Sequence, residues 1–370
     1  MSFPWKDLNN QLKDIWQQHA VTVFPSMVRQ GVSTTIYGLA CMQADWSDLH
    51  PDFQDVFQKQ VIHCLHIPNL RSQLRVSQVI SNIFYGLGKC KAPWQSLTTE
   101  CRQTLLDAIL TCSEEFGGHE VGNIAYGLGG MIAPFQELPP AIFDTLAAVM
   151  DRVAEDISQT ELCSILHGLV NIDASWSRMT ERFKTALINI IRSQAKLDYI
   201  CLACITYCMG KYGAMWRDLP KVLCATLEKE LALSNSLADQ TLSNTIYGMG
   251  LMNVRWDDLP DVVRVSLFQV LGSSDAFASF KPQHISNTLW GLARMETIWS
   301  DLPTHNLEDA MNRMLSAASA QELANAIFGL GGLETTWSIL QLPTIQTLAQ
   351  AIESCYLRMN TQVLDSHIMF

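Results

Sequence analysis

Positive charge is scarce in this chain of 370 residues, which has 25 Lys and Arg residues against 36 Asp and Glu residues. The formal net charge is −11 at pH 7. Because neutralisation of phosphates supplies most of the affinity of nucleic-acid-binding proteins, this balance argues against a general nucleic-acid binder, and we expect no DNA partner. An acidic exterior better suits a basic or polar protein partner.

Long apolar runs are also missing. No stretch reaches the ~20 apolar residues that a transmembrane helix needs, and the first residues lack the basic start and apolar run of a signal peptide. We therefore expect no membrane insertion and a cytoplasmic location. The chain has 11 cysteines, an odd number that lies mostly inside helical patterns. This arrangement is typical of reduced core thiols in a reducing compartment.

The motifs that usually carry chemistry are absent from the sequence. It contains no P-loop, dinucleotide-binding fingerprint, nucleophile elbow or His-Glu-x-x-His. Cys201 and Cys204 form a Cys-x-x-Cys, but a zinc or redox role would require a second pair or a thioredoxin-like context. We therefore interpret both as packing residues and expect no enzyme, no metal and no cofactor.

What the sequence does contain is one phrase that recurs eight times. A clear copy runs from Asn287 to Met295 as NTLWGLARM, and WSDLP follows it from Trp299 to Pro303. We take the aromatic residue that opens the second part as the anchor of each unit, and successive anchors are 38 to 48 residues apart. A fixed period of this size predicts a stack of similar small units. The first eight anchors open the units, and the ninth follows the last glycine phrase: Trp5, Trp46, Trp94, Phe135, Trp176, Trp216, Trp256, Trp299 and Trp337.

Each unit is predicted to contain two helices. The first helix carries apolar residues at helical spacing, and Ser319-Ala-Gln-Glu322 at its start matches a capping box. The second follows the Trp-x-Asp-Leu-Pro phrase, in which Asp258 and Asp301 are expected to accept from first-turn amides. We therefore predict an all-α fold, an α-solenoid (superhelix) of about eight two-helix repeats of ~38–48 residues. It is expected to form a single domain over residues 1–370, closed by a terminal helix at 343–359.

Glycine occupies one column inside the first helices, eight residues before the anchor. Each glycine in a helix interior costs roughly 1 kcal/mol relative to alanine, so the column needs a reason. We predict close backbone approach between neighbouring first helices, with the recurring Trp filling the gap between units. The clearest members of this structural signature are Gly86, Gly127, Gly248, Gly291 and Gly329, with Trp94, Trp256, Trp299 and Trp337.

Two further columns have both structural and ligand-binding interpretations. Asn recurs twelve residues before the anchor, at Asn82, Asn123, Asn244, Asn287 and Asn325. We favour a structural ladder in which each buried amide bonds the backbone of the next unit, over contact with a ligand. A ring recurs nine residues before the anchor, as Tyr37, Tyr85, Tyr126, Tyr207, Tyr247, Trp290 and Phe328. These rings could stack on bases, but we favour a place in the core between repeats.

A column in the first turn of the first helix is the better candidate for ligand contact. It lies sixteen residues before the anchor, is mostly polar and recurs at one height along the stack. The plainer interpretation is a row of solvated polar residues near helix N-termini. The candidates for the ligand surface are Gln30, Gln78, His119, Gln240, Gln283 and Gln321.

The repeated phrase resembles octotricopeptide repeats at Phe280–Met295 and Ser319–Leu333. It is also similar to related short helical repeats of intracellular bacterial pathogens such as Legionella and Coxiella. The resemblance covers nearly the whole chain and implies an α-solenoid. Its organellar branch implies single-stranded RNA as the ligand, whereas its bacterial branch implies a secreted effector that is translocated into a host cell.

From the sequence we expect a non-catalytic helical-repeat protein that recognises a protein partner along a shallow surface. The alternative is a single-stranded RNA-binding protein of the octotricopeptide type. Charge favours the protein partner, because the first-helix segments are close to neutral without a continuous basic track and the acidic excess lies mainly on second helices and turns.

Overall fold

The computed structural model describes residues 4–66, 70, 75–233 and 237–367, and it gives side chains up to Tyr356 apart from Ser274. These residues form 17 α-helices and, where described, no strand. The helices fall into two compact units, Met1–Ala195 and Lys196–Phe370. The predicted all-α class is confirmed, and the prediction of one domain over the whole chain stays a prediction.

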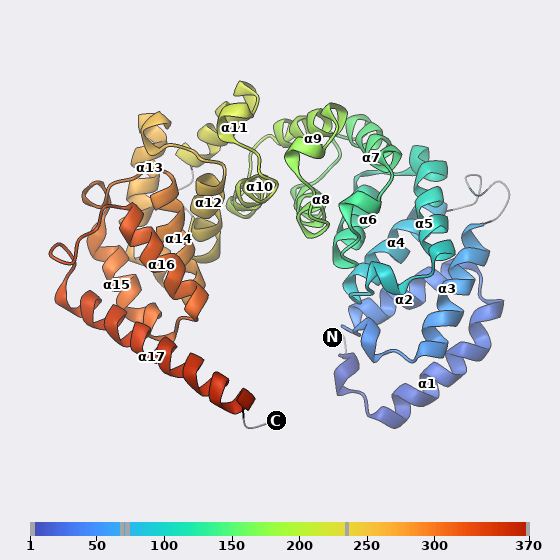
Figure 1. Ribbon diagram of the computed structural model, residues 1–370. Helices are drawn as coiled ribbons and strands as arrows, with labels where there is room; N and C mark the ends of the chain where they lie inside the picture. The colour runs from blue at the N-terminus through green and yellow to red at the C-terminus, as the bar shows by residue number, and fades with distance from the viewer. Residues whose placement is uncertain (1–3, 67–69, 71–74, 234–236, 368–370) are drawn as a thin grey trace. The chain divides into compact units, whose positions relative to one another are not determined.

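In the described part of the first unit the helices α1 to α9, coloured blue to green in Figure 1, alternate between two roles. The first helices of the repeats, α2, α4, α6 and α8, pack against one another in sequence order, and the second helices do the same. The bounds are α1 (Asn10–Val23), α2 (Arg29–Cys41), α3 (Pro51–Leu65), α4 (Val76–Lys89), α5 (Thr99–Cys112), α6 (Gly118–Gly130), α7 (Pro140–Arg152), α8 (Gln159–Asn171) and α9 (Glu181–Ser193).

The second unit repeats this arrangement with the helices α10 to α17. Its first helices, α10, α12, α14 and α16, again pack in sequence order, so the predicted α-solenoid of two-helix repeats is confirmed. The predicted terminal helix is present and continues to His367, because neither Pro nor Gly interrupts it. The bounds are α10 (Tyr199–Lys211), α11 (Lys221–Ala232), α12 (Asp239–Leu251), α13 (Asp261–Leu271), α14 (Pro282–Arg294), α15 (Thr304–Met314), α16 (Ala320–Gly332) and α17 (Leu342–His367).

The glycine column brings neighbouring first helices into backbone contact, as predicted. A Cβ atom on Gly127 would lie 2.3 Å from the carbonyl oxygen of Phe84, and one on Gly248 would lie 2.4 Å from that of Thr206. Gly38 heads the same column on α2, and a Cβ atom there would meet nothing within 4 Å. Glycine is therefore required by the backbone of the preceding first helix, and not by the conformation of the helix that contains it.

The anchors join consecutive repeats through the backbone. A short 3-10 helix begins at each of the first eight anchors. The amide of Trp46 donates to the carbonyl of Cys90 at the end of α4 (2.6 Å), and that of Trp256 donates to Met295 at the end of α14 (2.8 Å). Anchor side chains are buried as expected in most repeats, with exposed fractions of 2% for Trp94, 7% for Trp256 and 3% for Trp299.

Trp337 is a correction to this pattern, because its side chain is 61% exposed. Most anchors are joined through their backbone amide to the end of the first helix of the next repeat. Since α16 is the last first helix that the structure describes, Trp337 has no such neighbour among the described residues. Ile327 on α16 is exposed as well, with an exposed fraction of 45%. The equivalent residue on α12, Ile246, is 0% exposed.

Helix starts were predicted correctly in part. Ser319 and Glu322 form the expected capping box on α16. The prediction that the aspartates of the anchor phrase cap the second helices is wrong. The N-cap residues of α13 and α15 are Pro260 and Pro303, which form no side-chain cap bond. Asp258 and Asp301 end the preceding 3-10 helices and therefore lie two residues before the N-cap position.

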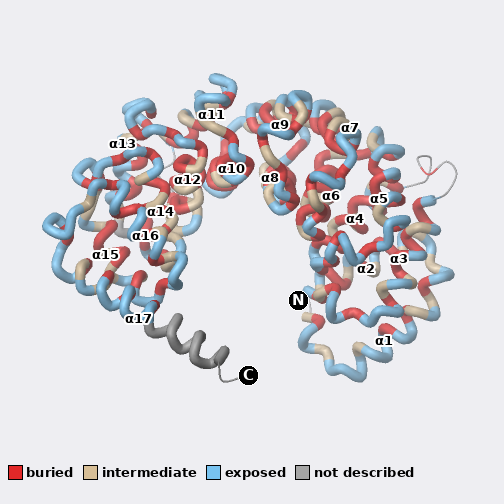
Figure 2. The backbone as a smooth tube through the Cα atoms, in the orientation of Figure 1, coloured by how far each residue is buried: buried red, intermediate tan, exposed pale blue. Residues whose placement is uncertain are grey.

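The buried and exposed residues alternate along each helix, as Figure 2 shows. Eight of the 11 cysteines are buried, which suits the predicted core role. Burial raises the pKa of the Cys90 and Cys101 thiols to about 12, so both stay protonated at neutral pH. Among the helices described, none has the length and apolar character needed to cross a bilayer.

Every first helix ends in a left-handed residue that the sequence did not reveal. On α6, Ile132 donates to Gly129 (3.0 Å) and Ala133 donates back to Leu128 (3.1 Å), which is a Schellman motif. Glycine usually fills the left-handed position, but here only one of eight is glycine. The residues are Gln43, Lys91, Ile132, Asp173, Gly213, Asn253, Glu296 and Glu334.

We predict that Ile132→Gly raises the free energy of unfolding by about 1 kcal/mol, because a β-branched residue is strained at its φ of 53°. Little burial is lost, since Ile132 is 71% exposed. The matched change, Gly213→Ala at a φ of 73°, should lower stability by a similar amount, although a Cβ atom there meets nothing within 4 Å. Urea denaturation of the full chain measures both. Equal signs for the two changes would contradict the role of backbone strain.

Candidate functional site

The predicted ligand column is one of four columns on a face that recurs on each of the eight first helices. Positions sixteen, twelve, nine and five residues before the anchor follow the spacing i, i+4, i+7, i+11, so they lie along one face of each helix. We call this face the first-helix stripe. In the first unit it consists of Gln30, Thr34, Tyr37, Cys41, Gln78, Asn82, Tyr85, Lys89, His119, Asn123, Tyr126, Gly130, Thr160, Ser164, His167 and Asn171. In the second it consists of Ile200, Cys204, Tyr207, Lys211, Gln240, Asn244, Tyr247, Leu251, Gln283, Asn287, Trp290, Arg294, Gln321, Asn325, Phe328 and Gly332.

The first-turn column is exposed at all eight positions. Three of its polar members, Gln30, His119 and Gln321, pair with the side chain one turn later on the same helix. Gln321 Nε2 donates to Asn325 Oδ1 (3.0 Å), and the ring of His119 is hydrogen-bonded to the amide of Asn123 (3.1 Å). The ligand-surface candidates are therefore placed at the surface, beside the Asn column.

The Asn column is half-buried on the same face. The recorded hydrogen bonds of Asn123 and Asn325 stay within their own helices. Among the described residues, no side chain of this column bonds the backbone of a neighbouring helix, which differs from the expected ladder. The reason is geometric: the close contacts between helices are made by the glycine column, which points sideways, whereas the Asn column points outward with the Gln column.

The ring column is a further correction. Its members are partly exposed, with Tyr37 at 41% and Phe328 at 54%, so the column does not form the core between repeats. Except at Ile327, the residue immediately before each ring is buried and fills the core instead, as Ile36 and Ile246 do at 0% exposure. One residue of difference rotates a side chain by ~100° around a helix, which separates the two columns.

The rings stack on one another from helix to helix. In the first unit the ring centroids of Tyr37, Tyr85 and Tyr126 are 5.6 and 5.3 Å apart. In the second unit Tyr207, Tyr247, Trp290 and Phe328 follow at 6.2, 4.9 and 6.4 Å. We call these two rows the ring ladders. Burial raises the pKa of the Tyr85, Tyr207 and Tyr247 hydroxyls, so they remain neutral hydrogen-bonding groups at physiological pH.

Charge is distributed unevenly between the stripe and the rest of the chain. Of its four positions in each of eight helices, none is Asp or Glu, although the chain has 36 acidic residues. The cations of the stripe are Lys89, Lys211 and Arg294. Lys89 Nζ lies 5.9 Å from the ring centroid of Tyr126, and the guanidinium carbon of Arg294 lies 5.8 Å from that of Trp290. Cations and ring ladders therefore adjoin each other in both units.

Each unit also has a groove where the stripe meets the loops after the first helices. The groove of the first unit has a volume of about 930 Å³ and includes Lys6, Lys89 and Lys91 among its lining residues. The groove of the second unit, of about 520 Å³, includes Arg217, Arg255 and Arg294. Carboxylates on the loops neutralise part of this charge: Lys91 pairs with Asp45 (2.9 Å) and Arg255 pairs with Glu296 (3.0 Å).

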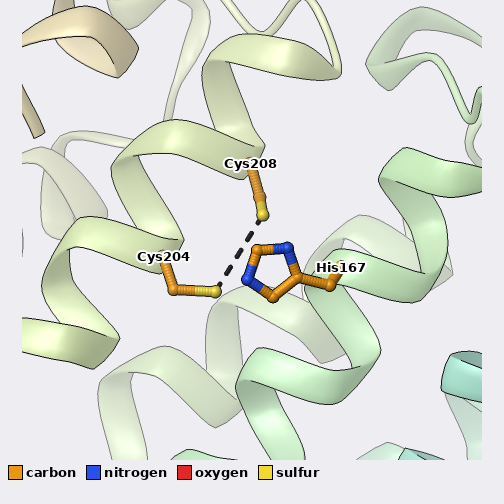
Figure 3. Close-up of side chains that lie close together, drawn as sticks. All are labelled: His167, Cys204 and Cys208. Carbon is orange, nitrogen blue, oxygen red and sulfur yellow. Dashed lines mark hydrogen bonds between the residues drawn. The ribbon is translucent and has the colours of Figure 1, made fainter. Parts of the chain in front are cut away.

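The cysteine pair singled out in the sequence lies on α10. Cys201 and Cys204 are 1% and 6% exposed, and Cys208 one turn later is 0% exposed. Figure 3 shows the Cys204 and Cys208 thiols, whose sulfur atoms are 4.0 Å apart. Such burial suits the packing role that the sequence suggested.

Comparison with protein-family models gives no match for this sequence. Comparison with curated proteins gives no similar sequence either. The octotricopeptide resemblance therefore rests on the repeated phrase alone, and function is inferred from the chemistry of the first-helix stripe.

Proposed function

We propose that the chain binds single-stranded RNA along the first-helix stripe of each unit. The observation that carries this proposal is the exclusion of Asp and Glu from every position of the stripe in a chain of net charge −11. Random placement of so many carboxylates would put several there, and each would repel phosphate. The notable feature is therefore where negative charge is missing, not the overall charge.

The groups on the stripe suit the three parts of a nucleotide. Lys89, Lys211 and Arg294 offer positive charge to phosphates, assisted by the loop cations of the two grooves. The Gln and Asn columns offer paired carboxamides to base edges, and helical-repeat proteins can read one base per repeat with two or three side chains. In each unit the ring ladder supplies apolar rings and tyrosine hydroxyls beside the cations and carboxamides.

We propose that this role is binding without catalysis. The stripe presents mainly amides, rings and cations, which suit contacts with bases and phosphates. A cytoplasmic location, including the cytoplasm of a host cell for a translocated protein, is compatible with this proposal and is suggested by the family resemblance alone.

A polypeptide partner is the second candidate, because the faces of the rings are already occupied. Ring centroids 4.9 to 6.4 Å apart leave no space for bases to insert between neighbouring rings. Paired carboxamides both donate and accept, so they also match the backbone of an extended peptide. For RNA, the bases must instead lie over the carboxamides with their edges toward the stripe.

The direct test is a titration of the full chain with a pool of fluorescent single-stranded RNA about twenty nucleotides long, at low and at near-physiological salt. We expect retention that weakens as salt rises, as counterion release requires, and much weaker retention of duplex DNA. No retention at low salt would contradict the RNA proposal. Tight binding of an extended peptide in the same assay would then support the second candidate.

We predict that Gln240→Ala combined with Gln283→Ala weakens RNA binding at least about thirtyfold, since each of the two lost base contacts removes ~1 kcal/mol or more. Both side chains are exposed and lie outside the core, so the melting temperature should stay within about 1 °C of the original. Anisotropy titrations and thermal melts measure the two effects. A parallel loss of stability would show that the column is structural.

A further inference from the structure

Three successive first helices of the second unit carry the same pair of side chains at the same two positions. The helices α12, α14 and α16 present Gln240 with Asn244, Gln283 with Asn287, and Gln321 with Asn325. No other three neighbouring first helices share a pair. In the same unit α10 carries Ile200 and Cys204 instead, neither of which is a carboxamide.

The three pairs lie at equal heights because backbone contacts fix the helices against each other. A Cβ atom on Gly291 would lie 2.6 Å from the carbonyl oxygen of Ile246, and one on Gly329 would lie 2.6 Å from the carbonyl carbon of Leu289. In each pair the Gln is exposed and the Asn is half-buried. The surface therefore repeats one chemical pattern three times, once on each helix.

The pair on α16 shows what this pattern offers to a ligand. Gln321 Nε2 donates to Asn325 Oδ1 (3.0 Å), which fixes the two carboxamides relative to each other. Gln321 Oε1 then remains an acceptor and Asn325 Nδ2 a donor, side by side at the surface. One acceptor beside one donor complements the edge of adenine, whose N6 amino group donates and whose N7 accepts.

We propose that α12, α14 and α16 bind three successive adenines of a single-stranded RNA, one per helix. Each Gln Oε1 accepts from N6, and each Asn Nδ2 donates to N7. The helix α10 makes no base-edge hydrogen bond, because Ile200 has no polar group and Cys204 is only 6% exposed. This inference rests on the proposed function and adds the base composition of the ligand.

The test uses the full chain and fluorescent twelve-nucleotide RNAs that contain three adjacent adenines within oligouridine. We expect each adenine replaced by uridine to weaken binding about tenfold, and cytidine or guanosine in its place to do no better. In the variant Gln283→Ala with Asn287→Ala, the middle adenine should become replaceable without loss, while the outer two keep their effect. The control Val262→Ala changes an exposed apolar residue of α13, outside the first-helix stripe, and should change neither affinity nor preference.

The oligonucleotide series on the unaltered chain decides the matter even if a variant fails to fold. RNA binding without a preference for the adenine run, or with a preference for another base, would overturn the inference and leave the proposed function standing. Absence of any RNA binding would overturn both. A preference for adenine that survives in the double variant would show that the other elements read the base, which also contradicts the assignment.

Discussion

Gly127→Ala is expected to lower the free energy of unfolding by about 3 kcal/mol, at the upper end of what one added carbon costs in a packed interior. The new Cβ atom would lie 2.3 Å from the carbonyl oxygen and 2.4 Å from the carbonyl carbon of Phe84. Both are backbone atoms of α4, so no side chain can rotate away and α6 must move as a body. Urea denaturation of the full chain measures the change.

The control is Gly38→Ala in the same column. A Cβ atom there meets nothing within 4 Å, and Gly38 lies inside α2, so alanine should raise stability by about 1 kcal/mol through helix propensity alone. The two substitutions are chemically identical and are predicted to have opposite signs. If Gly127→Ala also stabilised the chain, backbone contact between repeats would not be the reason for the glycine column.

The second large effect concerns charge on the first-helix stripe. The triple change Lys89→Glu, Lys211→Glu and Arg294→Glu should weaken RNA binding at least a hundredfold at near-physiological salt. Three phosphate contacts are lost and three repulsions replace them. The slope of log affinity against log salt concentration should become shallower by about 2, because each contact on a single strand contributes ~0.7 to it. Anisotropy titrations at several salt concentrations measure both quantities.

The matched control reverses three exposed cations of the second helices, Arg182→Glu and Arg192→Glu on α9 with Lys221→Glu on α11. Both triples change the net charge by the same amount. We expect the control to weaken binding only a few-fold, because its charges lie off the stripe and are screened beyond ~10 Å. Equal losses for the two triples would mean that overall charge, and not the stripe, governs binding.

The sequence predicted those features that local repetition determines. The period, the alternation of first and second helices and the need for glycine follow from residue spacing, and Gly127 and Gly248 meet a neighbouring backbone as expected. The environment of Gly38 and Trp337 could not be predicted from the repeat pattern. Gly38 matches the glycine column and Trp337 matches the anchors in sequence, but the structure describes no first helix before the one or after the other.

The surface was harder to predict than the fold. Rings and core residues occupy adjacent positions, such as Ile36 and Tyr37, and both are compatible with burial; only the rotation of the helix separates them. Residues such as Ile132 gave no sign of a left-handed backbone, because that conformation is usually marked by glycine. The net charge of whole first-helix segments did not reveal that the stripe lacks Asp and Glu, because carboxylates on the other faces of the helices were included in the sum.

The most direct test of the account is to map where RNA touches the chain, by ultraviolet cross-linking of a single-stranded RNA followed by mass spectrometry of the peptides. We predict cross-links to ring-ladder residues, above all Tyr85 and Tyr126 on the first unit and Tyr247 and Trp290 on the second. Cross-links that fall mainly on second helices such as α3, α5 or α13, or that spread evenly over the chain, would contradict the assignment of the first-helix stripe as the binding surface.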